Sequence, residues 1–255
     1  MSAAVRVTTI PGSGPIVLLA PHGGRRDPAH RMRTAGRLRV NDLHTAELTA
    51  ELAALLGATA LVNARQDRNE VDWNRISAAH AEAPDFLERL AAVLTATIAR
   101  HGRATVLVIH GWNVIQPVVD LGLGCLPGAD PFTADPSAAV SPGFAATGVQ
   151  ALADACVARG ITATVGARYP ARHRENLLQL FTPRYRDDPR PRVRALATLA
   201  AYVDAVQLEL GIVLRWPGPW RGRLLAACVA ARPMLEAPPR DDAGHSARPE
   251  ATSAQ

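Results

Sequence analysis

Runs of apolar residues alternate along the chain with segments in which apolar residues recur every three or four positions. The runs at 16–20, 59–63 and 105–109 have the length of buried strands, and Gly, Pro or polar residues bound each of them. Between these runs, apolar residues at helical spacing predict amphipathic helices. Strands that alternate with helices are typical of a mostly parallel sheet with crossover helices, so the pattern predicts an α/β fold.

The clearest helical pattern covers 45–56, where leucines recur on one face and Gly57 follows the last turn. Asn41 or Asp42 is the expected N-cap of this helix, because short polar side chains accept hydrogen bonds from the free amides of a first turn. The same criteria predict helices at 85–100, 142–159, 193–202 and 220–235, and strands at 162–167 and 205–210.

The segment 112–141 is rich in Gly and Pro and has no clear periodicity. We expect it to form a long irregular loop beside the predicted strand at 105–109, where it would serve as a lid or wall of a site.

The length of 255 residues and the hydrophobic content of 48% are sufficient for one sizeable core. We expect a single domain at 1–236 and a disordered tail at 237–255, where Pro, Arg, Asp and Ser follow no period. The N-terminus carries no signal-peptide pattern, and no apolar run approaches the length of a membrane span. These features predict a cytoplasmic protein that has no membrane partner, and its three cysteines are expected to be reduced.

The net charge is +5 and the sequence pI is near 9.8, with every basic residue outside the histidines an arginine. No aromatic residues interleave the arginine-rich stretches in the way that stacking on bases requires, so we expect no nucleic-acid partner. Arginines of this kind suit solvated loops and, in part, an electrostatic funnel for an anionic substrate. The oligomeric state cannot be inferred from these features.

Two histidines lie just past apolar runs: His22 follows 16–20 after Pro21, and His110 follows 105–109. In an open α/β sheet the carboxyl ends of the strands line the ligand-binding crevice, so both imidazoles are expected in one site. Asp27 lies five residues after His22, and two imidazoles with one carboxylate are a typical catalytic zinc set. Such a set leaves a position open for a water whose pKa the metal lowers to about 7.

Glu209 interrupts an apolar run and is the candidate general base, because a carboxylate in a buried strand is usually paired, protonated or functional. The alternative is that Glu209 and Gln207 simply face solvent on an edge strand. A polar cluster after the strand at 59–63 contains Arg68, Asn74 and Arg75, and its guanidiniums and amide can bind a substrate carboxylate.

Arg168 follows the predicted strand at 162–167 and would add a further anion contact. The alternative for the polar cluster is that Asp67, Glu70 and Asp72 pair with its arginines in a surface turn.

Taken in order, these motifs resemble the N-formylglutamate amidohydrolase family over nearly the whole chain. The resemblance rests on Pro21-His22-Gly23-Gly24, Asn41-Asp42, Arg68 with Asp72-Trp73-Asn74-Arg75, His110 and Gln207-Leu208-Glu209. The turn at 22–28 is also similar to the ligand turn of poly-γ-glutamate hydrolases, and the wider group resembles zinc carboxypeptidases. This resemblance implies a three-layer α/β/α, phosphorylase/hydrolase-like fold with a mixed, mostly parallel sheet and one Zn²⁺.

The resemblance further implies that His22, Asp27 and His110 bind zinc and that Glu209 relays protons. Because Asp27 is shorter than the glutamate of the related turn, Asp42 and Glu47 stay open as the third ligand. Arg68, Asn74, Arg75 and Arg168 are expected to bind substrate. The implied activity is hydrolysis of the amide bond of an N-acyl acidic amino acid such as N-formylglutamate. A metallopeptidase for γ-glutamyl or C-terminal peptide bonds and a non-catalytic anion-binding domain are the alternatives.

Overall fold

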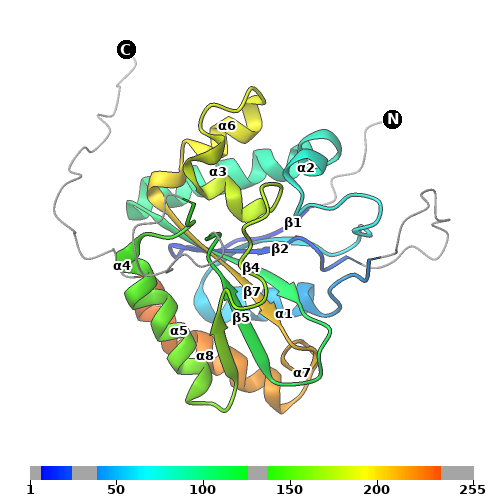
Figure 1. Cartoon of the computed structure of the whole chain (residues 1–255), viewed down its shortest axis with the longest axis vertical. Helices are drawn as coiled ribbons and strands as arrows, with labels where there is room; N and C mark the ends of the chain where they lie inside the picture. Colours follow the sequence, from blue (N-terminus) through cyan, green and yellow to red (C-terminus); the bar gives the residue numbers. More distant parts are fainter. Residues whose placement is uncertain (1–6, 25–38, 126–136, 237–255) are drawn as a thin grey trace.

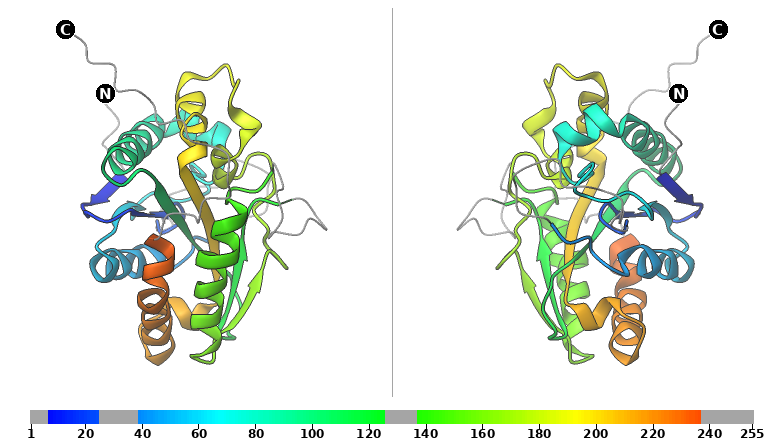
Figure 2. Two further views of the ribbon diagram at one scale, coloured as in Figure 1. Left: turned by 90° about the vertical axis from the view of Figure 1, so that its left-hand side faces the viewer. Right: turned by 90° about the vertical axis from the view of Figure 1, so that its right-hand side faces the viewer.

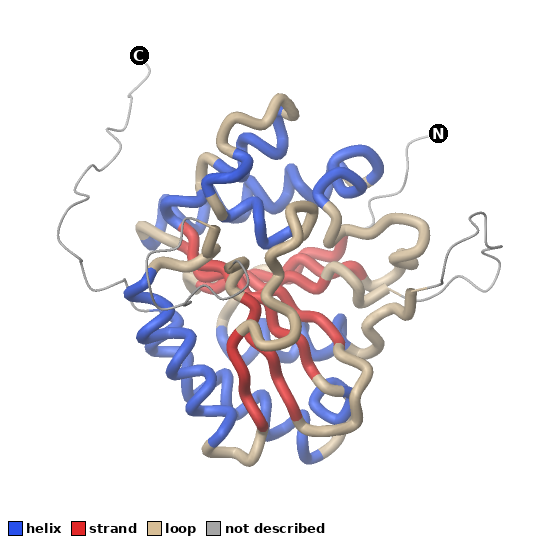
Figure 3. The backbone as a smooth tube through the Cα atoms, in the orientation of Figure 1, coloured by secondary structure: helices blue, strands red, loops and turns tan. Residues whose placement is uncertain are grey.

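The computed structural model describes residues 7–24, 39–125 and 137–236. They form a seven-stranded sheet with helices on both faces, as Figure 1 and Figure 3 show. Across the sheet, the strand order is β1 (Val7–Ile10), β3 (Thr59–Asn63), β2 (Ile16–Ala20), β4 (Ala104–Gly111), β7 (Val203–Leu210), β5 (Val118–Gly122) and β6 (Thr162–Val165).

The four central strands β3, β2, β4 and β7 are parallel. Strand β1 is antiparallel to β3, β5 is antiparallel to β7, and β6 is parallel to β5. The predicted three-layer fold with a mixed, mostly parallel sheet is therefore confirmed. Since β2 and β4 are neighbours and run in the same direction, their carboxyl ends bring His22 and His110 to the same edge of the sheet.

Both faces of the sheet are buried, which explains why most residues of its central strands are apolar. On one face lie α1 (Thr45–Leu56), α4 (Pro142–Phe144), a π-helical turn (Ala145–Val149), α5 (Gln150–Val157) and α8 (Pro219–Glu236). On the other face lie α2 (Ile76–Glu82), α3 (Pro84–His101) and α6 (Pro191–Ala197). The two views in Figure 2 show these helix layers on either side of the twisted sheet.

Strand residues alternate between the two cores. Leu107 and Ile109 of β4 pack in the core under α1 and α8, whereas Val106 and Val108 pack in the core under α3. His110 continues the second set, since successive strand side chains point to opposite faces. The sheet thus directs His110 to the face that carries α2, α3 and α6.

The helix at 45–56 has the predicted bounds, but its predicted N-cap is wrong. Its N-cap is His44, with a left-handed backbone (φ 65°), and neither Asn41 nor Asp42 caps it. The side chain of Asp42 contacts two histidines instead, and the Asp42 carbonyl accepts a hydrogen bond from the hydroxyl of Thr45. The predicted end at Gly57 is correct.

Several other elements differ from the sequence-based expectation. The segment 112–141 is not irregular throughout, because β5 lies within it. The predicted helix at 193–202 is two elements, α6 and a 3₁₀ turn (Ala200–Tyr202). Further short elements were not predicted: β1, α2, α7 (Ile212–Arg215) and 3₁₀ turns at Leu177–Phe181 and Pro183–Tyr185.

These short elements hold too few residues for a periodic pattern to develop, and Asp120 also breaks the apolar run of β5.

Within the described ranges, no helix combines the length and hydropathy needed to cross a bilayer. The predicted tail at 237–255 lies outside the described residues.

Candidate metal centre and active site

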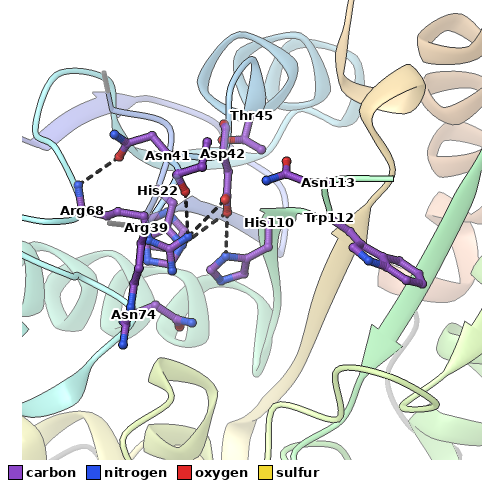
Figure 4. A network of polar contacts seen from close by, with 12 residues as sticks. His22, Arg39, Asn41, Asp42, Thr45, Arg68, Asn74, His110, Trp112 and Asn113 are labelled. Carbon is purple, nitrogen blue, oxygen red and sulfur yellow. Dashed lines mark hydrogen bonds and ion pairs between the residues drawn. The ribbon is translucent and has the colours of Figure 1, made fainter. Parts of the chain in front are cut away.

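Three buried side chains from separate segments meet at the carboxyl edge of the central strands. His22 follows β2, His110 lies near the end of β4, and Asp42 precedes α1. One ligand atom from each lies within 4.8 Å of the other two, and the three residues are 1%, 2% and 5% exposed, respectively, for His22, His110 and Asp42. Figure 4 shows both imidazoles directed toward the Asp42 carboxylate.

His22 contacts a carboxylate with each ring nitrogen. Its Nε2 lies 2.6 Å from Oδ1 of Asp72, and its Nδ1 lies 3.3 Å from Oδ2 of Asp42. An ionised carboxylate only accepts hydrogen bonds, so Nε2 of His22 must be protonated and donate a hydrogen bond to Asp72. In a neutral imidazole Nδ1 would then direct a lone pair at a lone pair of Asp42. A positive charge is needed between these two atoms, supplied by a second proton or by a metal ion.

The protonation equilibria of the metal-free site agree with this geometry. Burial alone lowers the pKa of His22, but hydrogen bonds to Asp42 and Asp72 outweigh burial and raise it above its usual value. Burial opposes ionisation of Asp42 and Asp72, yet their histidine contacts hold both carboxyl pKa values well below the usual range. In the absence of metal, a proton on His22 therefore provides the positive charge.

His110 approaches the same oxygen from the other side. Its Nδ1 lies 3.1 Å from Oδ2 of Asp42, and its ring centroid is 4.8 Å from that of His22. Burial lowers the pKa of His110 to about 4, and the charge of His22 adds to this effect. A neutral imidazole is the form that binds a metal ion, so burial keeps His110 ready to act as a ligand.

The two spacings between the histidine nitrogens and the Asp42 carboxylate fit a zinc site. Two ligands, each about 2.0–2.1 Å from a tetrahedral zinc ion, lie about 3.3 Å from one another. The Nδ1 atoms of His22 and His110 lie 3.3 and 3.1 Å from Oδ2 of Asp42. The carboxylate of Asp72 on the far nitrogen of His22 is also the usual outer partner of a metal-binding imidazole, because it fixes the tautomer and orients the ring.

Arg68 and Asn41 hold the Asp42 segment. Arg68 Nη1 lies 3.3 Å from Oδ1 of Asp42 and donates to the carbonyl of Val40. The side chain of Asn41 accepts from the Arg68 amide and donates to Asp67, which is also buried. Arg68 thus contacts the Asp42 carboxylate, and it also lines the cavity described next, so its role in substrate binding stays a prediction.

A cavity of about 750 Å³ opens beside this group. Its wall combines the candidate metal ligands with Glu209 and with several cations and amides from other loops. The lining residues include Asn74, Arg75, Trp112, Arg168, Tyr169, His173, Asn176, Gln207 and Glu209.

Glu209 is 9% exposed and lies on β7, directly opposite His110 in the sheet register. Strand β7 lies between β4 and β5, so the alternative that Glu209 and Gln207 face solvent on an edge strand is wrong. Burial raises the pKa of Glu209 to about 8, and the negative charge of Asp42 contributes in the same direction.

A directional chain of hydrogen bonds orients the Glu209 carboxyl group. The amide of Leu178 can only donate, and it bonds to Oδ1 of Asn176. Asn176 Nδ2 therefore donates to Oε1 of Gln207, and Gln207 Nε2 donates to Oε1 of Glu209, both at 2.9 Å. Because Oε1 accepts from Gln207, a proton on Glu209 resides on Oε2.

Arginines and amides form another part of the wall. Arg75 Nη1 lies 3.0 Å from Nδ1 of His173, and its Nε is 3.9 Å from Oδ2 of Asp72. The backbone N–H of Asn74 donates a hydrogen bond to Oδ1 of Asp72. The side-chain oxygen of Asn74 accepts a hydrogen bond from the backbone N–H of Leu177. The alternative that Asp72 pairs with arginines of its own turn holds in part, but its closest contact is the one to His22.

Arg168 lies on a loop that the buried carboxylate of Asp120 anchors. Asp120 accepts from the hydroxyl of Thr164 and from the backbone amides of Ala167, Arg168 and Tyr169, at 2.6–3.0 Å. Tyr169 packs edge-on against Trp112, with ring centroids 5.5 Å apart. Asp120 thus fixes the backbone that presents Arg168 and Tyr169 to the cavity.

The structure tests two of the three carboxylates that the sequence offered as the third metal ligand. Asp27 lies outside the described residues. Glu47 is exposed on α1 and is not part of the group, whereas Asp42, one of the three alternatives, is. Gly24 packs closely against the backbone carbonyl of Gln66. A Cβ atom at position 24 would overlap that carbonyl, so this backbone contact requires a glycine.

Sequence reasoning missed the contact of Asp72 with His22 and the role of Asp120. Asp120 could have been found by the criterion that singled out Glu209, since both are carboxylates within apolar strands. The pairing of Asp72 with a residue 50 positions away leaves no such local pattern.

Comparison with known proteins was made at the level of sequence and of structure. No protein-family model matches the chain. No curated protein matches its sequence. N-formylglutamate amidohydrolase from Ralstonia eutropha JMP134 superposes with a TM-score of 0.60 and 14% identity, over 91% of this chain and 97% of that one.

The gene product Atu2144 from Agrobacterium tumefaciens superposes with a TM-score of 0.56 and 13% identity, over 90% of this chain and 92% of that one. A bacteriophage poly-γ-glutamate hydrolase, with 13% identity over 92% of this chain and 90% of that one, reaches a TM-score of 0.46, too low for an argument. The chain therefore shares the α/β fold of the two bacterial structures.

Proposed function

We propose that the protein is a zinc-dependent hydrolase that cleaves the amide bond of an N-acyl acidic amino acid, with N-formylglutamate as the first candidate. The observation that carries the proposal is the buried group of His22, Asp42 and His110 beside a cavity that Glu209 also lines. The fold shared with an N-formylglutamate amidohydrolase supports the choice of substrate.

His22, Asp42 and His110 would hold the metal ion through two imidazole nitrogens and one carboxylate. A zinc ion bound by three protein ligands would supply a Lewis acid and a water molecule of lowered pKa. Asp72 accepts a hydrogen bond from Nε2 of His22, so Nδ1 is the nitrogen that would bind the metal ion, which would replace the proton that Nδ1 carries in the metal-free site. Arg68 in turn donates a hydrogen bond from Nη1 to Oδ1 of Asp42.

Glu209 is the proposed acid and base. In the metal-free site burial raises the pKa of its carboxyl group to about 8. A bound cation would lower that value toward the neutral range, where proton transfer in both directions is efficient. Gln207 holds Oε1, so Oε2 is the atom that takes up a proton from the attacking water and releases it to the leaving amine.

Arg75 and Asn74 are the proposed ligands of a substrate carboxylate next to the reacting bond, and Arg168 is the proposed contact of a second carboxylate. Arginine suits this role because its planar guanidinium binds a carboxylate with two parallel hydrogen bonds. Arg75 is held by His173 at the cavity wall, and its side chain is 35% exposed and accessible to a ligand.

The test is hydrolysis by the zinc-loaded protein of three compounds: N-formylglutamate, N-formyl-leucine and a γ-glutamyl oligomer. We expect the first to be cleaved with the highest kcat/KM, and Glu209→Gln to reduce it about 10²–10⁴-fold. Glu88→Gln, an exposed carboxylate on α3, is the control and should leave turnover unchanged. Preference for the oligomer would favour the metallopeptidase alternative. Absence of turnover on all three with zinc bound would favour a non-catalytic binding domain.

A further inference from the structure

Arg215, the last residue of α7, has a buried guanidinium that the proposed mechanism does not use. The residue is 1% exposed and forms no ion pair with the described carboxylates, although the negative charges of Asp42 and Glu209 act on it from a greater distance. A buried cation is normally paired, so the environment of Arg215 requires a different explanation.

The guanidinium donates hydrogen bonds to the carbonyls of three separate segments. Nη1 lies 2.7 Å from the carbonyl oxygen of Leu43, Nε lies 3.1 Å from that of Leu210, and Nη2 lies 3.3 Å from that of Trp112. Nη2 is also 3.3 Å from Oδ1 of Asn113. All the acceptors are neutral oxygens, and they surround the planar group.

Each of these carbonyls belongs to a segment that carries a site residue. Leu43 follows Asp42, Leu210 follows Glu209, and Trp112 lies two residues after His110. The segments of His110 and Glu209 already pair as β4 and β7 of the sheet. Asp42, however, comes from a connection outside the sheet, and Arg215 joins that connection to both strands.

Gly111 provides the space for this arrangement. A Cβ atom at this position would lie 2.5 Å from Nη1 and 2.6 Å from Cζ of Arg215. The guanidinium therefore packs directly on the backbone between His110 and Trp112, where any larger residue would displace it.

We propose that Arg215 is a positioning residue, which sets the distance between Asp42 and the pair of strands that carry His110 and Glu209. The inference rests on the proposed function for its catalytic consequence, but the geometry of the group does not depend on that function. Lysine cannot replace the guanidinium, because a single ammonium lacks the fixed fork that reaches three carbonyls in different directions.

The experiment compares Arg215→Lys with Arg221→Lys. Arg221 is a suitable control, since it is 4% exposed and lies close by, but its guanidinium pairs with Glu51 and bonds to the carbonyl of Arg215 rather than to a site segment. The first readout is the imidazole NMR spectrum of the metal-free proteins. The signals of His22 and His110 should shift or broaden in Arg215→Lys and should match the wild type in Arg221→Lys.

The second readout is zinc affinity, measured by competition with a chromophoric chelator. We expect Arg215→Lys to raise the Kd for zinc about 10–100-fold, as for residues that orient metal ligands, and Arg221→Lys to change it less than about threefold. If Arg215→Lys does not fold, Gly111→Ala displaces the guanidinium without removing it and should give the same changes in the histidine signals.

Unchanged histidine signals in Arg215→Lys, or in Gly111→Ala where that variant replaces it, would overturn the inference. So would equal effects of the two lysine variants, because they would indicate a general contribution to stability. A wild-type protein that binds no zinc would instead refute the proposed function, and the NMR comparison would still test the position of Arg215.

Discussion

Replacing Glu209 with glutamine should stabilise the metal-free protein against unfolding. The same substitution should abolish most of the activity of the zinc-loaded protein. The carboxyl group is 9% exposed, lies beside Asp42 and accepts one hydrogen bond from Gln207. A glutamine carbonyl can accept the same bond, and its amide group takes the place of the protonated oxygen. The substitution therefore removes a buried group that resists ionisation and leaves the packing in place.

The size of the effect follows from the pKa. Folding raises the pKa of Glu209 from 4.5 to about 8, so the native state retains a proton that the unfolded chain has lost. Below pH 4.5 both states are protonated and there is no penalty. As pH rises from 4.5 to 8, the wild type loses stability, by about 1 kcal/mol at pH 5, about 3 kcal/mol at pH 7 and about 5 kcal/mol above pH 8.

Denaturant unfolding of wild type and Glu209→Gln at pH 4, 5, 7 and 8.5, with chelator present, measures this difference directly. We expect the two proteins to be equally stable at pH 4 and the free energy of unfolding of the variant to exceed that of the wild type increasingly with pH, by about 3 kcal/mol at pH 7. Glu88→Gln provides a control for an exposed carboxylate. A constant difference between wild type and variant at all four pH values would refute the explanation.

Three further predictions concern the neighbours of Glu209. Asp72→Asn should weaken zinc binding about 10–100-fold in a chelator competition, because His22 loses its charged outer partner; unchanged affinity would contradict this role. Arg75→Ala should raise KM for an acidic substrate at least tenfold and change kcat less, whereas a loss confined to kcat would exclude carboxylate binding. His110 has a pKa lowered to about 4, so the metal-free protein should lose about 3 kcal/mol as pH falls from 6.5 to 4, relative to His110→Gln. Parallel pH profiles of these two proteins would show that burial of His110 has no such effect.

The strands that carry the two histidines could be predicted because both faces of the central sheet are covered. Residues 16–20 and 106–109 are apolar and buried, which distinguishes them from their surroundings. The histidine just beyond each run, His22 or His110, then marks the carboxyl edge of the sheet. The same reasoning identified Glu209, although its burial could not be distinguished from an edge position until the strand order was known.

The carboxylate that joins the two histidines could not be chosen from local spacing. Asp27 is closer in sequence to His22, whereas Asp42 is 20 residues away and reaches the site from a connection before α1. Its position depends on contacts with Arg68 and on the carbonyl of Leu43, which accepts from Arg215. Such contacts between distant segments leave no period or motif in the sequence.

Short elements escaped prediction for a related reason. Strand β5 has five residues with Asp120 in its middle, and α7 has four. Their sequences satisfy tertiary contacts, with Asp120 accepting backbone amides from another loop and Arg215 donating to three carbonyls. The residues that support the site were thus harder to find than those that line it.

The central claim is that His22, Asp42 and His110 form a zinc site, and elemental analysis of the purified protein tests it most directly. Wild type, His22→Ala/His110→Ala and the exposed-histidine control His101→Ala should be supplied with zinc and then dialysed. About one zinc per chain in the wild type and the control, with none in the double variant, is the result that the structure predicts. Zinc retained by the double variant, or absent from the wild type, would contradict the claim.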